Sequence, residues 1–461
     1  MNRSGVRFPL LAASLLAAAC DFSRFSELES SAPVVLLNHP GAVTSFGVSL
    51  AAASGDDDAR VLVGGTPGPS RAAFFELGFG TTPKDDAIDV GACSGSPNPC
   101  TLAVRPAALP EAEIGHAALG SFCFVLGVGH GQDSSTYGLI GRCGDGTEYT
   151  LPVPATVLKN LIQNDVIGKT PPAPLVLSAD RDLGPALAAG AKKEKLAWSY
   201  APKSRTPIAL VPPGSPDASY GAAVTIVRLD GGFGGIDGGV ATPASRRIVA
   251  VGAPDAAHVW FFDGDSGSAV GCFGGPTGFG RTLASGRVRP DALGGDDLVV
   301  ADATNVTVIA GSALRGLTPT NDITCSLAAL PPNAIIASFG CGSRNDTTGC
   351  PGSFGAALDV GDLDGDGDGE VLVGAPGLDV RGAASAGAVL VYDAEGPTPS
   401  ALTDQLFLSD AKTGDDLGSM VAAVHIRGRD VVLAAVPGSS RAAVFYCSSL
   451  LADGMGGERC Q

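Results

Sequence analysis

Short apolar runs separated by glycine-rich turns dominate the chain, and the clearest example lies between Gly352 and Ala394. Three runs occur in this stretch: Phe354 to Val360, Val371 to Val373, and Ala388 to Tyr392. Short apolar runs that are bounded by glycine turns are typical of antiparallel β-hairpins. We therefore expect three consecutive antiparallel strands here.

The same succession of a first strand, a second strand ending in small residues, and a third strand recurs along the chain. Seven units of this kind begin at Phe46, Ser121, Asp182, Tyr220, Phe279, Phe354 and Asp416. Weaker apolar runs lie between units and predict a fourth strand for each, as at Pro174 to Leu177, Thr206 to Leu210 and Gln405 to Leu408. Repeated units of four strands predict an all-β fold, a seven-bladed β-propeller of four-stranded antiparallel blades.

One further apolar run, Pro33 to Leu37, precedes the first unit. We expect it to supply the outer strand of the last blade, because closing a ring in this way removes the free edges of the sheet.

A cluster of five carboxylates separates the first two runs of the sixth unit. It consists of Asp362, Asp364, Asp366, Asp368 and Glu370, with glycines between them. Their alternation with glycine excludes a helix face, and a flexible loop of carboxylates can wrap a hard cation with oxygen ligands.

At these residues the sequence resembles a known family. Phe354-Gly355, the acidic loop and Val373-Gly374-Ala375-Pro376 together resemble an FG-GAP repeat of the integrin α-chain β-propeller. The resemblance implies that the unit is one blade of a seven-bladed propeller and that its loop binds Ca²⁺. When the ligand positions of the family are carried over to this chain, the resemblance implies five ligands: the side chains of Asp362, Asp364, Asp366 and Glu370 and the backbone carbonyl of Asp368.

The resemblance is strong in the sixth unit, good in the first, fourth, fifth and seventh, and weak in the second and third. The family usually has aspartate at the ninth loop position, so Glu370 departs from its pattern. An EF-hand is excluded because Val373 stands at the twelfth position and strands rather than helices flank the loop.

Other units lack a complete acidic loop. In the third unit we expect Lys192, Lys193, Glu194 and Lys195 to form the hairpin loop, which therefore cannot bind a cation. In the fifth, a loop of equal length places Arg289 where the first ligand would stand. We expect no calcium there and expect the Arg289 guanidinium to pair with Asp297 or Asp291 in place of the ion.

Residues 1–19 have the features of an export signal. Arg3 and Arg7 precede an apolar run, Phe8 to Ala19, that is too short to span a bilayer. Cys20 follows Leu16-Ala17-Ala18-Ala19, which resembles a bacterial lipobox with its leucine one place early, although the alanines also suit ordinary signal peptidase. We expect Cys20 to be lipidated, residues 20–32 to form a tether, and residues 33–461 to form the propeller.

Eleven cysteines are present, and ten remain when Cys20 is set aside. An even number in an exported chain predicts structural disulfides. We expect five sequential pairs: Cys93 with Cys100, Cys123 with Cys143, Cys272 with Cys325, Cys341 with Cys350, and Cys447 with Cys460. No cysteine or histidine spacing indicates zinc.

Composition limits the possible functions. The 461-residue chain is 45% hydrophobic and carries a formal net charge of −17, and it lacks the basic stripes of a nucleic-acid-binding protein. No GxSxG or HExxH motif and no RGD tripeptide occurs.

We therefore expect the protein to bind calcium and to act as a ligand-binding or adhesion module rather than as an enzyme. Its partner would be an unknown protein or polysaccharide, and a lipid anchor would hold it in the bacterial cell envelope, on either membrane, facing the periplasm or the exterior. The alternatives are a polysaccharide lyase or hydrolase on a propeller scaffold, which would need acidic and basic side chains in one cleft, and a structural envelope protein.

Overall fold

The computed structural model places most of the repeat units. The residues that it describes are 34–38, 46–54, 58–64, 73–79, 88–91, 117–118, 123–130, 137–143, 148–154, 157, 176–179, 186–200, 206–229, 246–289, 295–319, 323–326, 333–341, 353–394, 402–426 and 429–446. The expected export signal, Cys20 and the tether lie outside these residues.

The strands form seven antiparallel sheets of four strands each, which we number in chain order. Sheets 1 to 3 are β2 (Ser49–Ser54), β3 (Asp58–Gly64), β4 (Ala73–Phe79), β5 (Ile88–Gly91); β6 (Ala117–Ala118), β7 (Cys123–His130), β8 (Tyr137–Cys143), β9 (Glu148–Pro152); and β10 (Val176–Ala179), β11 (Leu187–Ala191), β12 (Leu196–Tyr200), β13 (Ile208–Leu210). Sheets 4 to 6 are β14 (Ala223–Leu229), β15 (Arg246–Ala253), β16 (His258–Asp263), β17 (Ala269–Gly274); β18 (Thr282–Gly286), β19 (Asp297–Ala301), β20 (Asn305–Ile309), β21 (Ile335–Gly340); and β22 (Leu358–Gly361), β23 (Glu370–Ala375), β24 (Ala388–Tyr392), β25 (Leu402–Leu406).

Sheet 7 joins the two ends of the described chain. It consists of β26 (Val421–Ile426), β27 (Arg429–Val436), β28 (Arg441–Phe445) and β1 (Val34–Asn38). Strand β1 pairs antiparallel with β28, from Val34 opposite Phe445 to Asn38 opposite Arg441. The run before the first unit therefore supplies the outer strand of the last sheet, as predicted, and covers the edge of β28.

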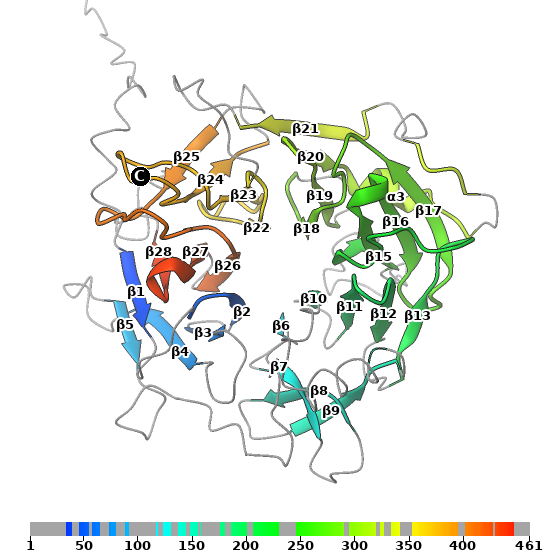
Figure 1. Cartoon of the computed structure of the whole chain (residues 1–461), viewed down its shortest axis with the longest axis horizontal. Helices are drawn as coiled ribbons and strands as arrows, with labels where there is room; N and C mark the ends of the chain where they lie inside the picture. Colours follow the sequence, from blue (N-terminus) through cyan, green and yellow to red (C-terminus); the bar gives the residue numbers. More distant parts are fainter. Residues whose placement is uncertain are drawn as a thin grey trace, which may run out of the picture.

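The sheets are arranged around a common centre (Figure 1). The first strand of each sheet contacts the first strand of the next through the whole series, and β26 of sheet 7 contacts β2 of sheet 1. The fold is all-β with four-stranded antiparallel sheets, and its arrangement is that of a β-propeller, as the repeats predict.

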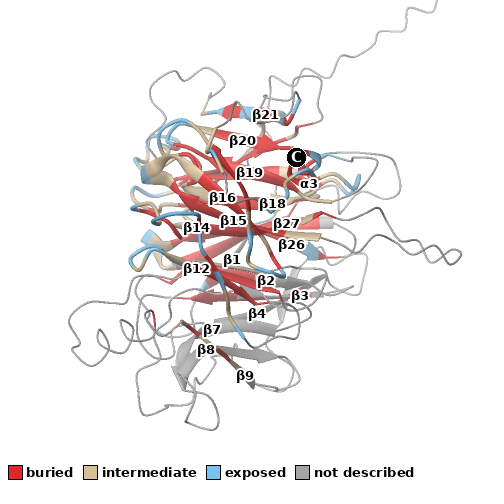
Figure 2. Cartoon of the chain, turned by 90° about the vertical axis from the view of Figure 1, so that its right-hand side faces the viewer, coloured by how far each residue is buried: buried red, intermediate tan, exposed pale blue. Residues whose placement is uncertain are grey.

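The middle strands of sheets 4 to 7 are buried on both faces where their burial is described, because each of these sheets packs between neighbours. Figure 2 shows most strands in red, and β23 and β24 are buried along almost their whole length. Phe339 of sheet 5 stacks on Tyr392 of sheet 6 with ring centroids 4.5 Å apart, and both are almost fully buried. This packing explains why the middle strands are continuous apolar runs rather than alternating ones.

Glycines of adjacent units meet where sheets pack. Gly418, near the start of the seventh unit, has a φ of +87°. Its carbonyl oxygen lies where a side chain on Gly374 of β23 would have to lie. The positive φ favours glycine at position 418, and the close approach of the Gly418 carbonyl leaves no room for a side chain at position 374. The glycines of the repeat therefore shape the contact between sheets.

Two weak units are offset from the sequence prediction. Val176–Ala179 is the first strand of sheet 3, so the expectation that the run from Pro174 supplies a fourth strand was wrong. The Lys192–Lys195 hairpin consequently joins the second and third strands, and in sheet 2 the run from Cys123 is likewise the second strand. The degenerate turn residues of these units gave no reliable marker for the first strand.

The helical elements whose bounds lie within the described residues are short: η2 (Pro254–Ala256), α3 (Gly311–Arg315) and η4 (Pro437–Ser439). Among the described residues, none of the helices has the length and apolar character needed to cross a membrane.

Candidate metal site

The acidic loop connects β22 and β23 of sheet 6. Pairing of the two strands from Leu358 opposite Val373 to Gly361 opposite Glu370 holds both ends of the loop at fixed positions. Gly365 and Gly367 turn the chain with φ angles of +80° and +94°, a conformation that glycine adopts without strain. The hairpin thus bends the carboxylates back toward one another.

Three of the five carboxylates converge. Side-chain oxygens of Asp362, Asp364 and Asp366 all lie within 4.8 Å of one another. Backbone amides fix the first of them, because Asp362 Oδ1 accepts a hydrogen bond from Gly365 N at 2.7 Å and its Oδ2 accepts one from Gly367 N at 3.1 Å. The loop therefore presents a compact set of oxygen donors.

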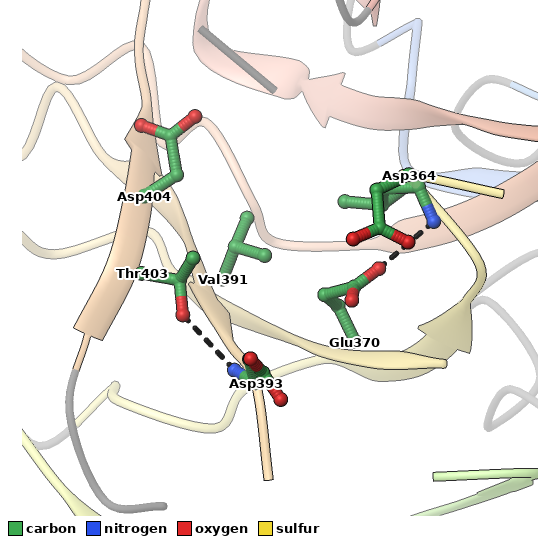
Figure 3. Close-up of a pocket in the computed structure, with 7 residues that line it drawn as sticks. Asp364, Glu370, Val391, Asp393, Thr403 and Asp404 are labelled. Atoms are coloured by element: carbon green, nitrogen blue, oxygen red, sulfur yellow. Dashed lines mark hydrogen bonds between the residues drawn. The ribbon is translucent and has the colours of Figure 1, made fainter. Parts of the chain in front are cut away.

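The other two expected ligands lie beside this group. Glu370 Oε2 accepts a hydrogen bond from Leu363 N at 2.8 Å, and its side chain points toward Asp364 (Figure 3). The backbone N–H of Asp368 donates to Asp366 Oδ1 at 2.9 Å. Glu370 and Asp368 are next to the site, but their side chains are outside the group of three.

The electrostatics of the loop favour a cation. The pKa of Glu370 is raised to about 8, chiefly by burial and also by the charges of Asp364 and Asp366, while the hydrogen bond from the Leu363 amide acts in the opposite direction. Burial is also the largest cause of the raised pKa values of Asp362 and Asp364, and repulsion from neighbouring aspartates adds to it. These raised pKa values reflect crowding and partial desolvation of the carboxylates, and a bound cation would relieve their repulsion.

The donor set fits calcium. It consists of carboxylate oxygens on a flexible hairpin, and Ca²⁺ accepts six to eight oxygen ligands in variable geometry. Zinc prefers nitrogen and sulfur ligands, whereas magnesium demands a tighter octahedron. The chemistry of the residues therefore agrees with the ion that the resemblance implies.

A small pocket of about 20 Å³ adjoins the loop and has room for a single water molecule or ion. Its titratable lining residues are all acidic, and they come from the loop and from the outer strands of sheet 6 (Figure 3). The pocket is lined by Leu363, Asp364, Glu370, Val391, Asp393, Thr403 and Asp404.

Sequence reasoning missed a neighbour of the loop that belongs to another sheet. Asp430 of β27 in sheet 7 accepts a hydrogen bond from Asp362 N and donates one to Asp362 O. The sequence around Asp430 contains no motif that would mark it, because the contact arises only from packing of sheet 7 on sheet 6.

The fifth unit differs from its prediction. Arg289 is exposed, and it contacts Asp297 through its backbone N–H, which donates to Asp297 Oδ2 at 3.1 Å. The other oxygen of Asp297 accepts a hydrogen bond from Gly311 N at 2.8 Å. The carboxylate of Asp297 is thus bound by backbone amides, and the expected contact from the Arg289 guanidinium to Asp297 is not what the structure shows. Asp291 lies outside the described residues.

Strand register also corrects the comparison of the two loops. Gly286 opposite Asp297 in sheet 5 corresponds to Gly361 opposite Glu370 in sheet 6. The residue equivalent to Asp362 is therefore Arg287 rather than Arg289, because the fifth loop is longer than the sixth.

The cysteines can be placed only in part. Cys272 and Cys325 form a disulfide with Cα atoms 4.7 Å apart, and Cys341 is also disulfide-bonded. Cys123 and Cys143 lie opposite each other on β7 and β8, as expected of neighbouring strands. The remaining cysteines are outside the described residues: Cys20, Cys93, Cys100, Cys350, Cys447 and Cys460.

Comparison with known proteins supports the assignment of the sixth unit. The family model described as "FG-GAP repeat" matches residues 354–392, which contain the acidic loop and the first three strands of sheet 6. No curated protein matches the chain. A solved structure, "Crystal Structure of Mitotic Checkpoint Complex", is similar at a TM-score of 0.44 with 9% identity over 97% of this chain and 96% of that chain. A likeness at this level carries no inference. The fold and the matched repeat together define a β-propeller-like module that contains an FG-GAP repeat.

Proposed function

We propose that the chain is an exported, lipid-anchored protein of the bacterial cell envelope whose seven sheets are the blades of one integrin α-like propeller. In this proposal the propeller binds calcium and acts as a ligand-binding or adhesion module. The observation that carries the proposal is the convergence of Asp362, Asp364 and Asp366 within the matched FG-GAP repeat.

The calcium ion would have a structural role. Asp362, Asp364, Asp366 and Glu370 would hold it with their side chains and Asp368 with its carbonyl. Extracellular calcium sites bind at roughly 10⁻⁴–10⁻³ M, so millimolar calcium would stabilise the fold by about 0.4–1.4 kcal/mol. Such a contribution is enough to order one hairpin.

Calorimetry of the purified protein with CaCl₂ tests the metal site. We expect one calcium ion to bind to the wild type, and we expect Asp364→Ala to abolish binding and the accompanying rise in melting temperature. Asp255→Ala is the matched control, because Asp255 is an exposed aspartate in the short helix η2 of sheet 4. Absence of calcium binding to the wild type would refute the proposed site.

The module would display the loops between its strands to a protein or polysaccharide, since loops on a rigid scaffold carry most binding functions. Crosslinking on intact cells, followed by a binding assay of the purified partner with and without calcium, tests this role. A lyase or hydrolase would instead release soluble fragments from envelope polysaccharides, and detection of such products would replace the binding proposal.

Anchoring is tested by mass spectrometry of the mature protein. We expect the mature chain to begin at a lipidated Cys20. A mature N-terminus without lipid would remove the anchor from the proposal and leave the calcium site unaffected.

A further inference from the structure

The first residue of the acidic loop is held by a residue of the next sheet. Asp362 N donates to Asp430 Oδ2 at 2.9 Å, and Asp430 N donates back to Asp362 O at 2.7 Å. Asp362 and Asp430 are 68 positions apart, and these two bonds fix both backbone polar groups of Asp362.

Asp430 is well placed to hold this geometry. It is 9% exposed, and its second carboxylate oxygen, Oδ1, lies 2.9 Å from His425 Nδ1 of the adjacent strand β26. The same two sheets are joined by a further hydrogen bond, in which Asp359 Oδ2 accepts from Ala423 N at 2.8 Å. The start of the loop is therefore attached to sheet 7 rather than to sheet 6 alone.

The same pair of bonds occurs between sheets 4 and 5 without an acidic loop. Arg228 N donates to Asp296 Oδ2 at 3.0 Å, and Asp296 N donates to Arg228 O at 2.7 Å. By strand register Arg228 occupies the place of Asp362. Asp296, which directly precedes β19, occupies the place of Asp430, the second residue of β27. The pairing is thus a contact between sheets that can exist without a metal site.

We propose that Asp430 is a positioning residue for the calcium loop and that it couples calcium binding to the packing of sheet 7, which β1 completes. This inference rests on the proposed calcium site. Fixing the backbone of Asp362 fixes the direction in which its carboxylate leaves the chain, and the charge of Asp430 adds to the attraction for a cation. Coupling of this kind is reciprocal, so calcium would also stabilise the contact between sheets 6 and 7.

The experiment compares Asp430→Ala with Asp296→Ala, which removes the equivalent carboxylate where no acidic loop is present. Calcium affinity is measured by calorimetry on the folded full-length proteins, with near-UV circular dichroism as the check of folding. Loss of a residue that orients a metal ligand lowers affinity by roughly 10–100-fold. We expect a loss in this range for Asp430→Ala and an affinity within about twofold of the wild type for Asp296→Ala.

A second measurement reports the coupling directly. Calcium should slow amide hydrogen exchange in β26 and β27 of the wild type and should have no such effect in Asp430→Ala. Asp430→Asn keeps a hydrogen-bond acceptor without the charge, so it should bind calcium between the two extremes, and it replaces Asp430→Ala if that variant does not fold.

The outcomes separate the two proposals. If the wild type binds no calcium, the calcium site and this inference both fail. If the wild type binds calcium and Asp430→Ala and Asp430→Asn bind it equally well, the site stands and the role of Asp430 is refuted. An equal loss in Asp430→Ala and Asp296→Ala would show general destabilisation and would also refute the role of Asp430.

Discussion

Glu370 makes the calcium-free protein sensitive to pH, and Glu370→Gln should remove that sensitivity. Burial raises the pKa of Glu370 from 4.5 to about 8. The folded state therefore holds a proton that the unfolded state releases between these two values. The contribution of Glu370 to the free energy of unfolding is fully present below pH 4.5 and is lost as the pH rises toward 8.

The size of the effect follows from the pKa. Each pH unit within the window lowers the free energy of unfolding by up to about 1.4 kcal/mol, so pH 5 to pH 7 costs the wild type up to about 3 kcal/mol. These values are upper limits because the loop can relax and admit water. A neutral glutamine does not ionise, so the variant lacks this contribution and should be the more stable protein at pH 8.

Urea unfolding in a chelating buffer at pH 5, 6, 7 and 8 measures this difference. Glu194→Gln is the control, because Glu194 lies in the lysine-rich hairpin of sheet 3, away from the acidic loop. Added calcium should stabilise the wild type more at pH 8 than at pH 6, because the ion binds the ionised carboxylate. Parallel pH profiles for wild type and Glu370→Gln would show that Glu370 is solvated and does not hold a proton in the folded protein at pH 7.

Three further predictions concern the fold. Phe339→Ala should lower the free energy of unfolding by about 3–5 kcal/mol because it leaves a cavity against Tyr392 between sheets 5 and 6, and a loss below 1 kcal/mol in urea unfolding would contradict the buried stack. Replacing Cys272 and Cys325 together by alanine should cost about 4 kcal/mol, since the disulfide closes a loop of 53 residues; unchanged unfolding under non-reducing conditions would contradict this. Deletion of residues 1–38 should expose the edge of β28 and cause self-association, which light scattering detects and which a monomeric, equally stable product would disprove.

Much of the fold could be predicted from local pattern. Strands, glycine turns and repeat period are properties of neighbouring residues, so the runs around Phe354 and the closing run before Asn38 identified sheet 6 and the fourth strand of sheet 7. The cation-binding role of the acidic loop could also be predicted, because alternating carboxylates and glycines indicate a cation site without reference to distant residues. The prediction failed in the weak units because their local turn residues are degenerate. The first strand of sheet 3, which begins at Val176, was therefore assigned as the outer strand of the preceding unit.

Contacts between sheets were decided by the tertiary structure alone. Asp430 forms a hydrogen bond with Asp362, which is 68 positions away in the sequence. No sequence spacing predicts this contact, because the two residues meet only when sheets 6 and 7 pack. Strand register likewise shows that Arg287, rather than Arg289, is equivalent to Asp362. The pairing of Gly286 with Asp297 that sets this register depends on hydrogen bonds between strands and not on loop length. Strand formation and the position of the charged loop could be predicted from short stretches of sequence, because both are local properties. Which neighbour holds that loop depended on the packing of whole sheets, a long-range property that no short stretch of the chain encodes.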